Sequence, residues 1–180
     1  MEGVQSKAPQ DPSSTKPRGE KSLMIAQVSL RSLVIICTLA ASCLIFTSKQ
    51  TTIVYGIPFD ASYSYEPAFQ FFGIANVAVC VLCLLSLGTV FFLSHRLANF
   101  FLFLHDLVVL TVLMAACAGS TAVGQIGRNG NTHSSWMPIC DHFAKFCTRV
   151  ATSVAFSYLA VLMFFALTVL SALRIQAKPI

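Results

Sequence analysis

Long runs of apolar residues separated by shorter polar segments make up most of the chain. Each run reaches the roughly 20 residues that a helix needs to cross the hydrocarbon core of a bilayer. None alternates apolar and polar positions over about ten residues, as the strands of a transmembrane barrel do. Because backbone groups in lipid must be hydrogen-bonded within their own segment, helices are the expected form. The pattern predicts four transmembrane helices, at residues 24–46, 69–93, 97–123 and 150–173.

The amino-acid composition agrees with an integral membrane protein. Of the 180 residues, 56% are hydrophobic and only 11% are charged, whereas soluble domains carry about 25% charged residues. Residues 1–21 are rich in Pro, Ser, Gln and charge, and we expect them to be disordered because they cannot bury a core. The predicted fold class is therefore an all-α integral membrane protein, a four-transmembrane-helix bundle over 22–175 with a short tail at 176–180.

The distribution of basic residues predicts the orientation, because cytoplasmic segments near transmembrane helices carry an excess of Lys and Arg. With four spans, both termini and the short link at 94–96 share one side. The basic residues on that side are seven: Lys7, Lys16, Arg18, Lys21, Arg96, Arg174 and Lys178. Those on the other side are four: Lys49, Arg128, Lys145 and Arg149. We therefore expect both termini in the cytoplasm, and the net charge of +5 is a topology signal that suggests no nucleic-acid partner.

The segments between the spans differ in length and composition. The very short inner link Ser-His-Arg-Leu-Ala makes the second and third spans antiparallel neighbours, as in a helical hairpin. The first outer loop, about 47–68, contains Thr-Thr-Ile-Val-Tyr, whose β-branched and aromatic residues favour a short strand. In the second outer loop, about 124–149, Gly and Asn mark turns, and residues 140–147 suit a short interfacial helix. The apolar anchors of this loop are Trp136, Ile139, Phe143 and Phe146.

Two charged residues interrupt the apolar runs. Arg31 lies in the first span and Asp106 in the third, where a charge at the bilayer centre costs about 2.5–3.5 kcal/mol on insertion scales. In the predicted topology both spans run outward, and both residues lie roughly 10–14 Å inside the cytoplasmic edge at 1.5 Å per residue. An arginine can hold a carboxylate through two parallel hydrogen bonds. Matched depth therefore predicts a structural intramembrane ion pair between Arg31 and Asp106.

The alternative is that Asp106 is a proton or ion site, as intramembrane carboxylates often are. His105 is the next residue, but consecutive side chains project about 100° apart around a helix, so we expect it to point away. The other spans offer no second acid to continue a relay. The structural pair is the preferred interpretation, and a small proton- or ion-coupled transporter using Asp106 is the alternative. For Arg31 alone, snorkelling toward the headgroups is a further interpretation.

Two of the seven cysteines lie outside the spans. Cys140 and Cys147 are in the second outer loop, which faces an oxidising compartment, so a disulfide is expected there. If 140–147 is helical, the two Cα atoms lie about 10 Å apart, whereas a disulfide requires Cα atoms within about 7 Å. Either the segment is bent, or each cysteine pairs elsewhere.

Other cysteines and histidines suggest chemistry only weakly. Cys80 and Cys83 form a C-x-x-C pair, but they lie near mid-bilayer without an acid or base to generate a thiolate, so packing is preferred over a redox site. A metal site built from His133, Cys140, His142 and Cys147 matches no standard zinc spacing. No nucleophile elbow, phosphate-binding loop or dinucleotide fingerprint is present. We therefore expect neither a metal, a cofactor nor an enzymatic activity.

Small residues in the spans favour close helix packing. Ala115 and Gly119 have the small-x-x-x-small spacing, and Gly73 and Gly88 lie in the second span. Such residues either pack the bundle or join protomers, and the sequence does not separate these two roles.

The combined features resemble the Casparian strip membrane protein-like (CASP-like) family of land plants, which is related to the MARVEL four-helix proteins. The resemblance covers about residues 22–175. Arg31 and Asp106 match the family's intramembrane charged residues, and Trp136, Cys140 and Cys147 match its second-loop pattern. Members closest to the Casparian strip proteins proper have a first-loop segment similar to Glu-Thr-Leu-Pro-Phe-Phe-Thr-Gln-Phe. The corresponding region here reads VYGIPFDASYSYEPAFQFF, so the resemblance favours a CASP-like paralogue.

The resemblance implies a multi-pass scaffold in the plasma membrane. Members of the family associate with themselves and with one another, form stable membrane domains and, in the founding group, recruit wall-modifying enzymes. By this resemblance we expect homo- and hetero-oligomers with CASP-like proteins, embedded in the lipid bilayer, whose outer loops face wall-modifying enzymes.

Overall fold

Four long helices and one β-hairpin form the structure. The computed structural model describes residues 16–54, 56–92 and 96–176. A short 3₁₀ turn at Tyr63–Tyr65 follows the hairpin, and another at Thr132–Ser134 lies between the last two helices. The elements are α1 (Lys16–Phe46), β1 (Lys49–Val54), β2 (Ile57–Ser62), α2 (Pro67–Phe92), α3 (Arg96–Asn129) and α4 (Ala144–Gln176).

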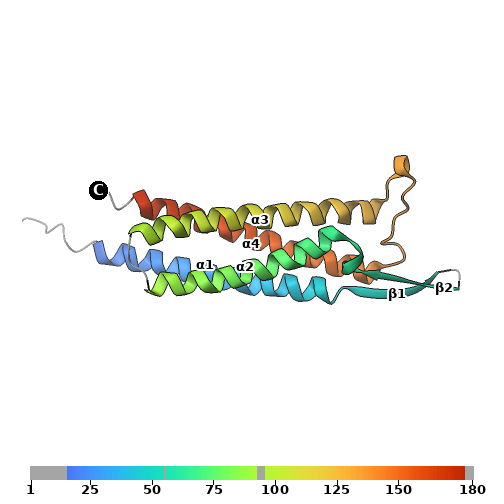
Figure 1. Ribbon diagram of the computed structural model, residues 1–180, viewed down its shortest axis with the longest axis horizontal. Helices are drawn as coiled ribbons and strands as arrows, with labels where there is room; N and C mark the ends of the chain where they lie inside the picture. The colour runs from blue at the N-terminus through green and yellow to red at the C-terminus, as the bar shows by residue number, and fades with distance from the viewer. Residues whose placement is uncertain (1–15, 55, 93–95, 177–180) are drawn as a thin grey trace, which may run out of the picture.

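The four helices pack as a ring in which each contacts its two neighbours. α4 packs against α1 and α3, and α2 packs against the same two helices, so α1 and α3 lie diagonally opposite each other. In Figure 1, α1 begins at the end of the bundle where α4 ends, and the hairpin extends from the opposite end. We call these the terminal end and the hairpin end. The diagonal arrangement matters because the two intramembrane charges lie on α1 and α3.

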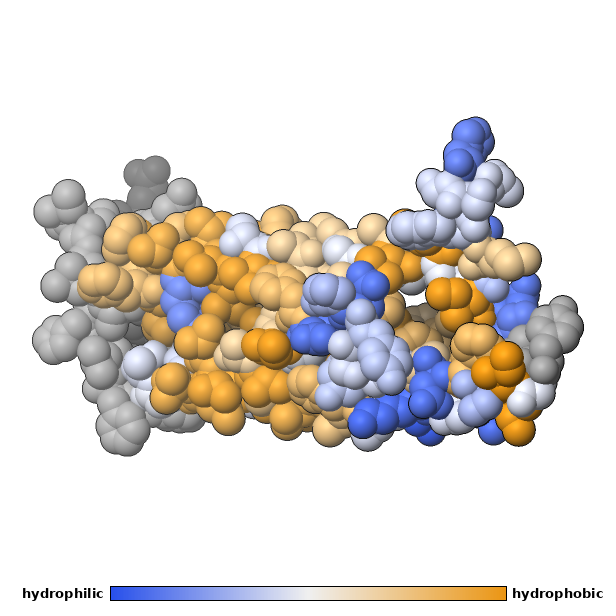
Figure 2. Space-filling model, turned by 45° about the vertical axis from the view of Figure 1, so that its right-hand side comes forward, coloured by the Kyte–Doolittle hydropathy of each residue, from blue (hydrophilic) through white to orange (hydrophobic). Residues whose placement is uncertain are grey.

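The helices are long and apolar enough to cross a membrane, which confirms the predicted four-span, all-α fold class. The candidate spans are Ser22–Phe46, Pro67–Thr89, Phe100–Asn129 and Ala144–Ile175. Figure 2 shows apolar residues along most of the bundle on one face, with hydrophilic residues gathered toward the hairpin end. The cytoplasmic location of both termini stays a prediction.

The helices extend further than the apolar runs. Residues 16–21 belong to α1, so the prediction that all of 1–21 is disordered is wrong for this part, and 1–15 lie outside the described residues. The predicted second loop at 124–149 shortens to 130–143, because α3 continues to Asn129 and α4 begins at Ala144. Residue 176 is the last of α4, and 177–180 lie outside the described residues. An existing helix extends easily because each added residue gains one hydrogen bond without a new nucleation step.

The first outer loop is a β-hairpin. β1 pairs with β2 in antiparallel register, from Lys49 opposite Ser62 to Val54 opposite Ile57. The predicted strand at 51–55 therefore has a partner that the sequence pattern did not indicate. In the turn between the strands, Gly56 has φ +82°, a conformation that glycine adopts at no steric cost.

The core of the bundle is made of apolar side chains that range from alanine to phenylalanine. Its fully buried members include Val34, Ala41 and Ile45 on α1, Phe72 on α2, Leu113 on α3, and Phe164 and Leu167 on α4. Gly73 allows α1 and α2 to approach closely, because a Cβ there would lie 2.9 Å from the ring of Phe46. A Cβ at Gly119 would meet no atom within 4 Å, so this glycine has no packing role inside the bundle.

Candidate functional site

The two intramembrane charges meet across the bundle. Arg31 Nη2 donates to both carboxylate oxygens of Asp106, at 2.9 Å to Oδ1 and 2.7 Å to Oδ2. Both side chains have an exposed fraction of 0%. Because α1 and α3 lie diagonally opposite each other, this ion pair crosses the centre of the bundle and joins two helices that otherwise have little contact.

The geometry of the pair differs from the expected two parallel hydrogen bonds. One guanidinium nitrogen serves both carboxylate oxygens, while Arg31 Nη1 donates to Ser86 Oγ at 2.6 Å. Ser86 in turn donates to the carbonyl oxygen of Cys83 at 2.8 Å. In the expected arrangement, Arg31 Nη1 would also donate to Asp106. Here it donates to the hydroxyl of Ser86 on α2 instead.

α4 completes the surroundings of the carboxylate. Ser171 Oγ donates to Asp106 Oδ2 at 3.4 Å, and Gln27 Nε2 donates to Ser171 Oγ at 3.4 Å. All four helices thus contribute to one buried group, which we call the ionic cluster, consisting of Gln27, Arg31, Ser86, Asp106 and Ser171. Gln27 was detectable in the sequence, since it lies one turn before Arg31 on the same helix face, but serines are ordinary in transmembrane helices and carry no such signal.

His105 lies closer to Asp106 than expected, and the expectation that it points away is wrong. Its Nδ1 is 3.2 Å from Asp106 Oδ1, and its side chain is 25% exposed. The separation of about 100° between consecutive residues applies to the Cα–Cβ bonds. Beyond Cβ, two adjacent side chains can turn toward each other. His105 is therefore a peripheral neighbour of the ionic cluster at the bundle surface.

The ionic cluster has the chemistry of a buried ion pair that stabilises one arrangement of the helices. Both oxygens of Asp106 accept hydrogen bonds, and the positive charge that faces it is held at the same depth. Within 16–54, 56–92 and 96–176, no group of three or more His, Cys, Asp or Glu is placed to hold a metal ion. Cys80 and Cys83 are buried free thiols, and Cys83 is adjacent to the cluster through its carbonyl.

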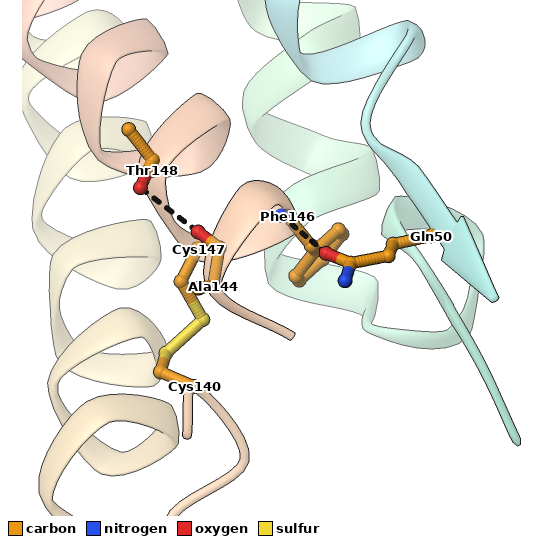
Figure 3. The surroundings of a disulfide bond; sticks show 6 residues. All are labelled: Gln50, Cys140, Ala144, Phe146, Cys147 and Thr148. Atoms are coloured by element: carbon orange, nitrogen blue, oxygen red, sulfur yellow. Dashed lines mark hydrogen bonds between the residues drawn. A yellow bond between two sulfur atoms is a disulfide. The ribbon is translucent and has the colours of Figure 1, made fainter. Parts of the chain in front are cut away.

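Cys140 and Cys147 form a disulfide at the hairpin end. Their Cα atoms lie 5.7 Å apart, because residues 140–143 form a bend and α4 begins only at Ala144. A continuous helix over 140–147, one of the two interpretations of the sequence, is therefore wrong. Figure 3 shows the bridge joining the bend to the first turns of α4, with Cys140 outside the helix.

The disulfide lies within a network that connects the second loop to the rest of the protein. The amides of Ile139 and Cys140 donate to the carbonyl oxygen of Gly127 at the end of α3, at 2.8 and 3.1 Å. On the other side, the amide of Phe146 donates to Gln50 Oε1 on β1 at 2.9 Å (Figure 3). We call this group the disulfide region: Gln50, Gly127, Ile139, Cys140, Phe146 and Cys147.

The predicted apolar anchors of this loop divide into two pairs. Phe143 is buried and Phe146 half-buried, whereas Trp136 and Ile139 are 60% and 52% exposed. The backbone of Trp136 is fixed, because its carbonyl oxygen accepts from the Asn131 amide at 2.9 Å. The indole itself faces outward, and its role at the membrane interface stays a prediction.

Comparisons with known proteins identify the family. The Casparian strip membrane protein domain matches residues 20–163. CASP-like protein 1F1 of Vitis vinifera is 44% identical over 177 residues, which cover 96% of this chain and 84% of that protein. CASP-like protein 1F2 of Populus trichocarpa is 43% identical and covers 82% of this chain and 83% of its own length.

A more distant relative is CASP-like protein 1F1 of Arabidopsis thaliana, which is 36% identical, with 81% of this chain and 86% of that protein covered. No solved structure matches the chain. The domain match extends over most of the four-helix bundle and includes the disulfide region and all of the ionic cluster except Ser171. The chain therefore belongs to the family of Casparian strip membrane protein domain proteins, among its CASP-like members.

Proposed function

We propose that this protein is a plasma-membrane scaffold whose copies associate side by side, organise a membrane domain and present their outer loops to wall-modifying partners. The observation that carries this proposal is the ionic cluster. The charged groups buried in the bundle bind one another, so they stabilise a fixed helix arrangement. A rigid membrane-embedded block with exposed outer loops is the kind of element from which a lateral assembly is built.

Transport through the bundle is not favoured. Asp106 is fully buried, and both of its oxygens are bound to Arg31. A carrier of the alternating-access kind needs a site reachable from each side in turn, usually formed between internal repeats. Proton-dependent uptake by the reconstituted protein, lost in Asp106→Asn, would favour transport over the scaffold.

The outward face of α3 supports association between copies. Ala115, Ala118, Gly119 and Ala122 are exposed on this helix, and a side chain at Gly119 would meet no atom of the same chain. α3 also buries the smallest share of its apolar span within the bundle, 28% against 44% for α2. Small residues allow helix backbones to approach closely in membranes, so we propose this face for contact between protomers.

The direct test is co-purification of two differently tagged copies from mild detergent. We expect the wild-type copies to associate and Gly119→Leu to reduce association several-fold, because a large side chain keeps the α3 backbones apart. The matched control is Gly88→Leu on α2, where added atoms also meet open space. Wild-type protein that is purely monomeric would contradict self-association, and equal losses in the two variants would contradict the choice of α3.

Formation of a membrane domain has its own test. We expect the fluorescently tagged protein to recover slowly after photobleaching in a laterally restricted patch of the plasma membrane, and Gly119→Leu to recover faster. Free diffusion of the wild-type protein over the whole cell surface would contradict the scaffold.

A further inference from the structure

The first two turns of α4 carry an open hollow lined by two cationic side chains. Its lining residues are Ala144, Lys145, Thr148 and Arg149. Figure 3 shows Ala144 and Thr148 one turn apart on the side of α4 that faces away from Phe146 and the hairpin. The hydrogen bond between Phe146 and Gln50 of the hairpin is therefore on another side of α4.

The positive charge of this hollow is not neutralised within the described part of the chain. Among the described residues, neither Lys145 nor Arg149 forms an ion pair with a carboxylate, and Asp141, which is close to them in the sequence, is not paired with either. The first turn of α4 has no acidic residue. Lys145 and Arg149 are four residues apart, a spacing at which like charges destabilise a helix, and cations near a helix N-terminus are unfavourable as well.

The height of the hollow matches the headgroup layer of a bilayer. Arg149 Nη1 donates to the carbonyl oxygen of Thr47 at 2.9 Å, and Thr47 follows the candidate span Ser22–Phe46 directly. That span has 25 residues and measures about 37 Å as a helix. This length exceeds the roughly 30 Å hydrocarbon core but not the roughly 40–45 Å bilayer that includes the headgroups. If this span is centred in the bilayer, its outer end and the guanidinium of Arg149 reach the headgroup layer.

The polar groups of the hollow offer hydrogen-bond donors, so they favour a ligand with acceptor oxygens. The hydroxyl of Thr148 donates to the carbonyl oxygen of Ala144 at 2.8 Å, so its proton is already used. The donors left for a ligand are the ammonium of Lys145 and the remaining N–H groups of Arg149, which suit phosphate oxygens. A zwitterionic lipid brings its own cation beside the phosphate, whereas an anionic lipid brings a net negative charge.

We propose that the hollow formed by Lys145, Thr148 and Arg149 binds the phosphate of an anionic phospholipid in the leaflet at the hairpin end. The lipid neutralises two cations that the protein leaves unpaired, and its acyl chains lie along the apolar surface of α4 toward the bilayer centre. By the predicted orientation this is the outer leaflet. The site is independent of the scaffold proposal, because it concerns a single protomer.

The test is lipid retention by the full-length protein in mild detergent, measured by native mass spectrometry with equimolar phosphatidylglycerol and phosphatidylcholine. We expect the wild type to retain the anionic lipid preferentially. Lys145→Gln should lower the preference roughly five-fold, the effect typical of one basic residue at an anionic surface, whereas Arg149→Lys keeps the charge and should retain most of it. Arg128→Gln, which removes an exposed charge at the end of α3 outside the hollow, is the matched control.

Three outcomes would overturn the proposal. One is no anionic preference in the wild type, which would mean that the hollow does not select an anionic headgroup. Another is an equal loss of preference in Lys145→Gln and Arg128→Gln, which would indicate general charge attraction. The third is an equal effect of another anion. If inorganic phosphate at matched ionic strength stabilises the protein against heat as much as phosphatidylglycerol does, the ligand is free phosphate. If a soluble polyuronate displaces the lipid, the ligand is an acidic polysaccharide.

Discussion

The ionic cluster and the disulfide region hold the same four helices together by opposite means. Near the terminal end, Arg31 and Asp106 join diagonal helices through a fully buried ion pair. At the hairpin end, Cys140 and Cys147 join a bend to α4 through a covalent bond. Hydrogen bonds from backbone amides attach the same loop to the end of α3. The first region lies inside the apolar bundle and the second lies at its edge.

The difference follows from the two environments. A buried charge without its partner is very costly in an apolar medium, so an ion pair there discriminates strongly between the correct and incorrect helix arrangement. At an exposed end, ion pairs contribute little to stability because water screens them. A disulfide stabilises such a region more, because it lowers the conformational entropy of the unfolded chain. We therefore expect the ionic cluster to control global folding and the disulfide region to control local order.

The largest effect is expected from breaking the ion pair. Asp106→Ala leaves the guanidinium of Arg31 buried without a countercharge, and we expect a loss of about 3–5 kcal/mol in the free energy of unfolding. The measurement is the fraction of monodisperse protein on size-exclusion chromatography in detergent, together with the thermal midpoint.

A double variant distinguishes a lost partner from lost packing. Arg31→Leu combined with Asp106→Leu removes both charges, and we expect it to recover most of the stability because apolar replacement of a buried pair is often neutral. Single variants as stable as the wild type would refute the role of the pair, and a double variant as poor as the singles would indicate that packing, not charge, sets the effect.

The next effect is expected from the disulfide. Cys140→Ser opens a loop closed across seven positions, and we expect a loss of about 2 kcal/mol. Limited proteolysis should show new cleavage at 130–143 while the helices stay protected. Cys43→Ser, which changes an exposed free cysteine on α1, is the control and should alter neither readout. Unfolding of the whole bundle in Cys140→Ser would contradict the expectation that the disulfide region controls only local order.

An effect of similar size, confined to the loop, is expected at Gly130. Its φ is +66°, and an added Cβ would lie 2.6 Å from the carbonyl oxygen of Trp136, so Gly130→Ala should cost about 1–3 kcal/mol through strain. Hydrogen exchange should show faster exchange of the Asn131 amide, which donates to the same oxygen. Gly124→Ala in the open part of α3 is the control and should leave that amide protected.

The smallest effect is expected at His105. Its imidazole is partly exposed and lies 3.2 Å from Asp106, so His105→Gln should change the free energy of unfolding by about 0.5 kcal/mol or less. Thermal melting in the same detergent provides the comparison with Asp106→Ala. A loss similar to that of Asp106→Ala would make His105 a full member of the ionic cluster.

Part of this architecture is readable from the chain because it depends on distance along one helix. The number of spans follows from the length of each apolar run relative to the bilayer. The common depth of Arg31 and Asp106 follows from counting residues from the ends of their spans, and the structure brings these two side chains together. The extent of the helices beyond the apolar runs, as at Ala144, is not readable, since polar turns extend a helix without leaving a hydrophobic signal.

The sequence by itself therefore determined a four-helix membrane protein with two charges at one depth and two cysteines in one loop. Only the tertiary structure decided that Gly73 faces Phe46 while Gly119 faces outward, that Ser86 and Ser171 surround the ion pair, and that the chain bends before Ala144. The physical reason is that a helix in lipid is apolar on its inner and outer faces alike. Its rotation about its own axis then leaves no periodic pattern in the sequence and is fixed by contacts with the neighbouring helices.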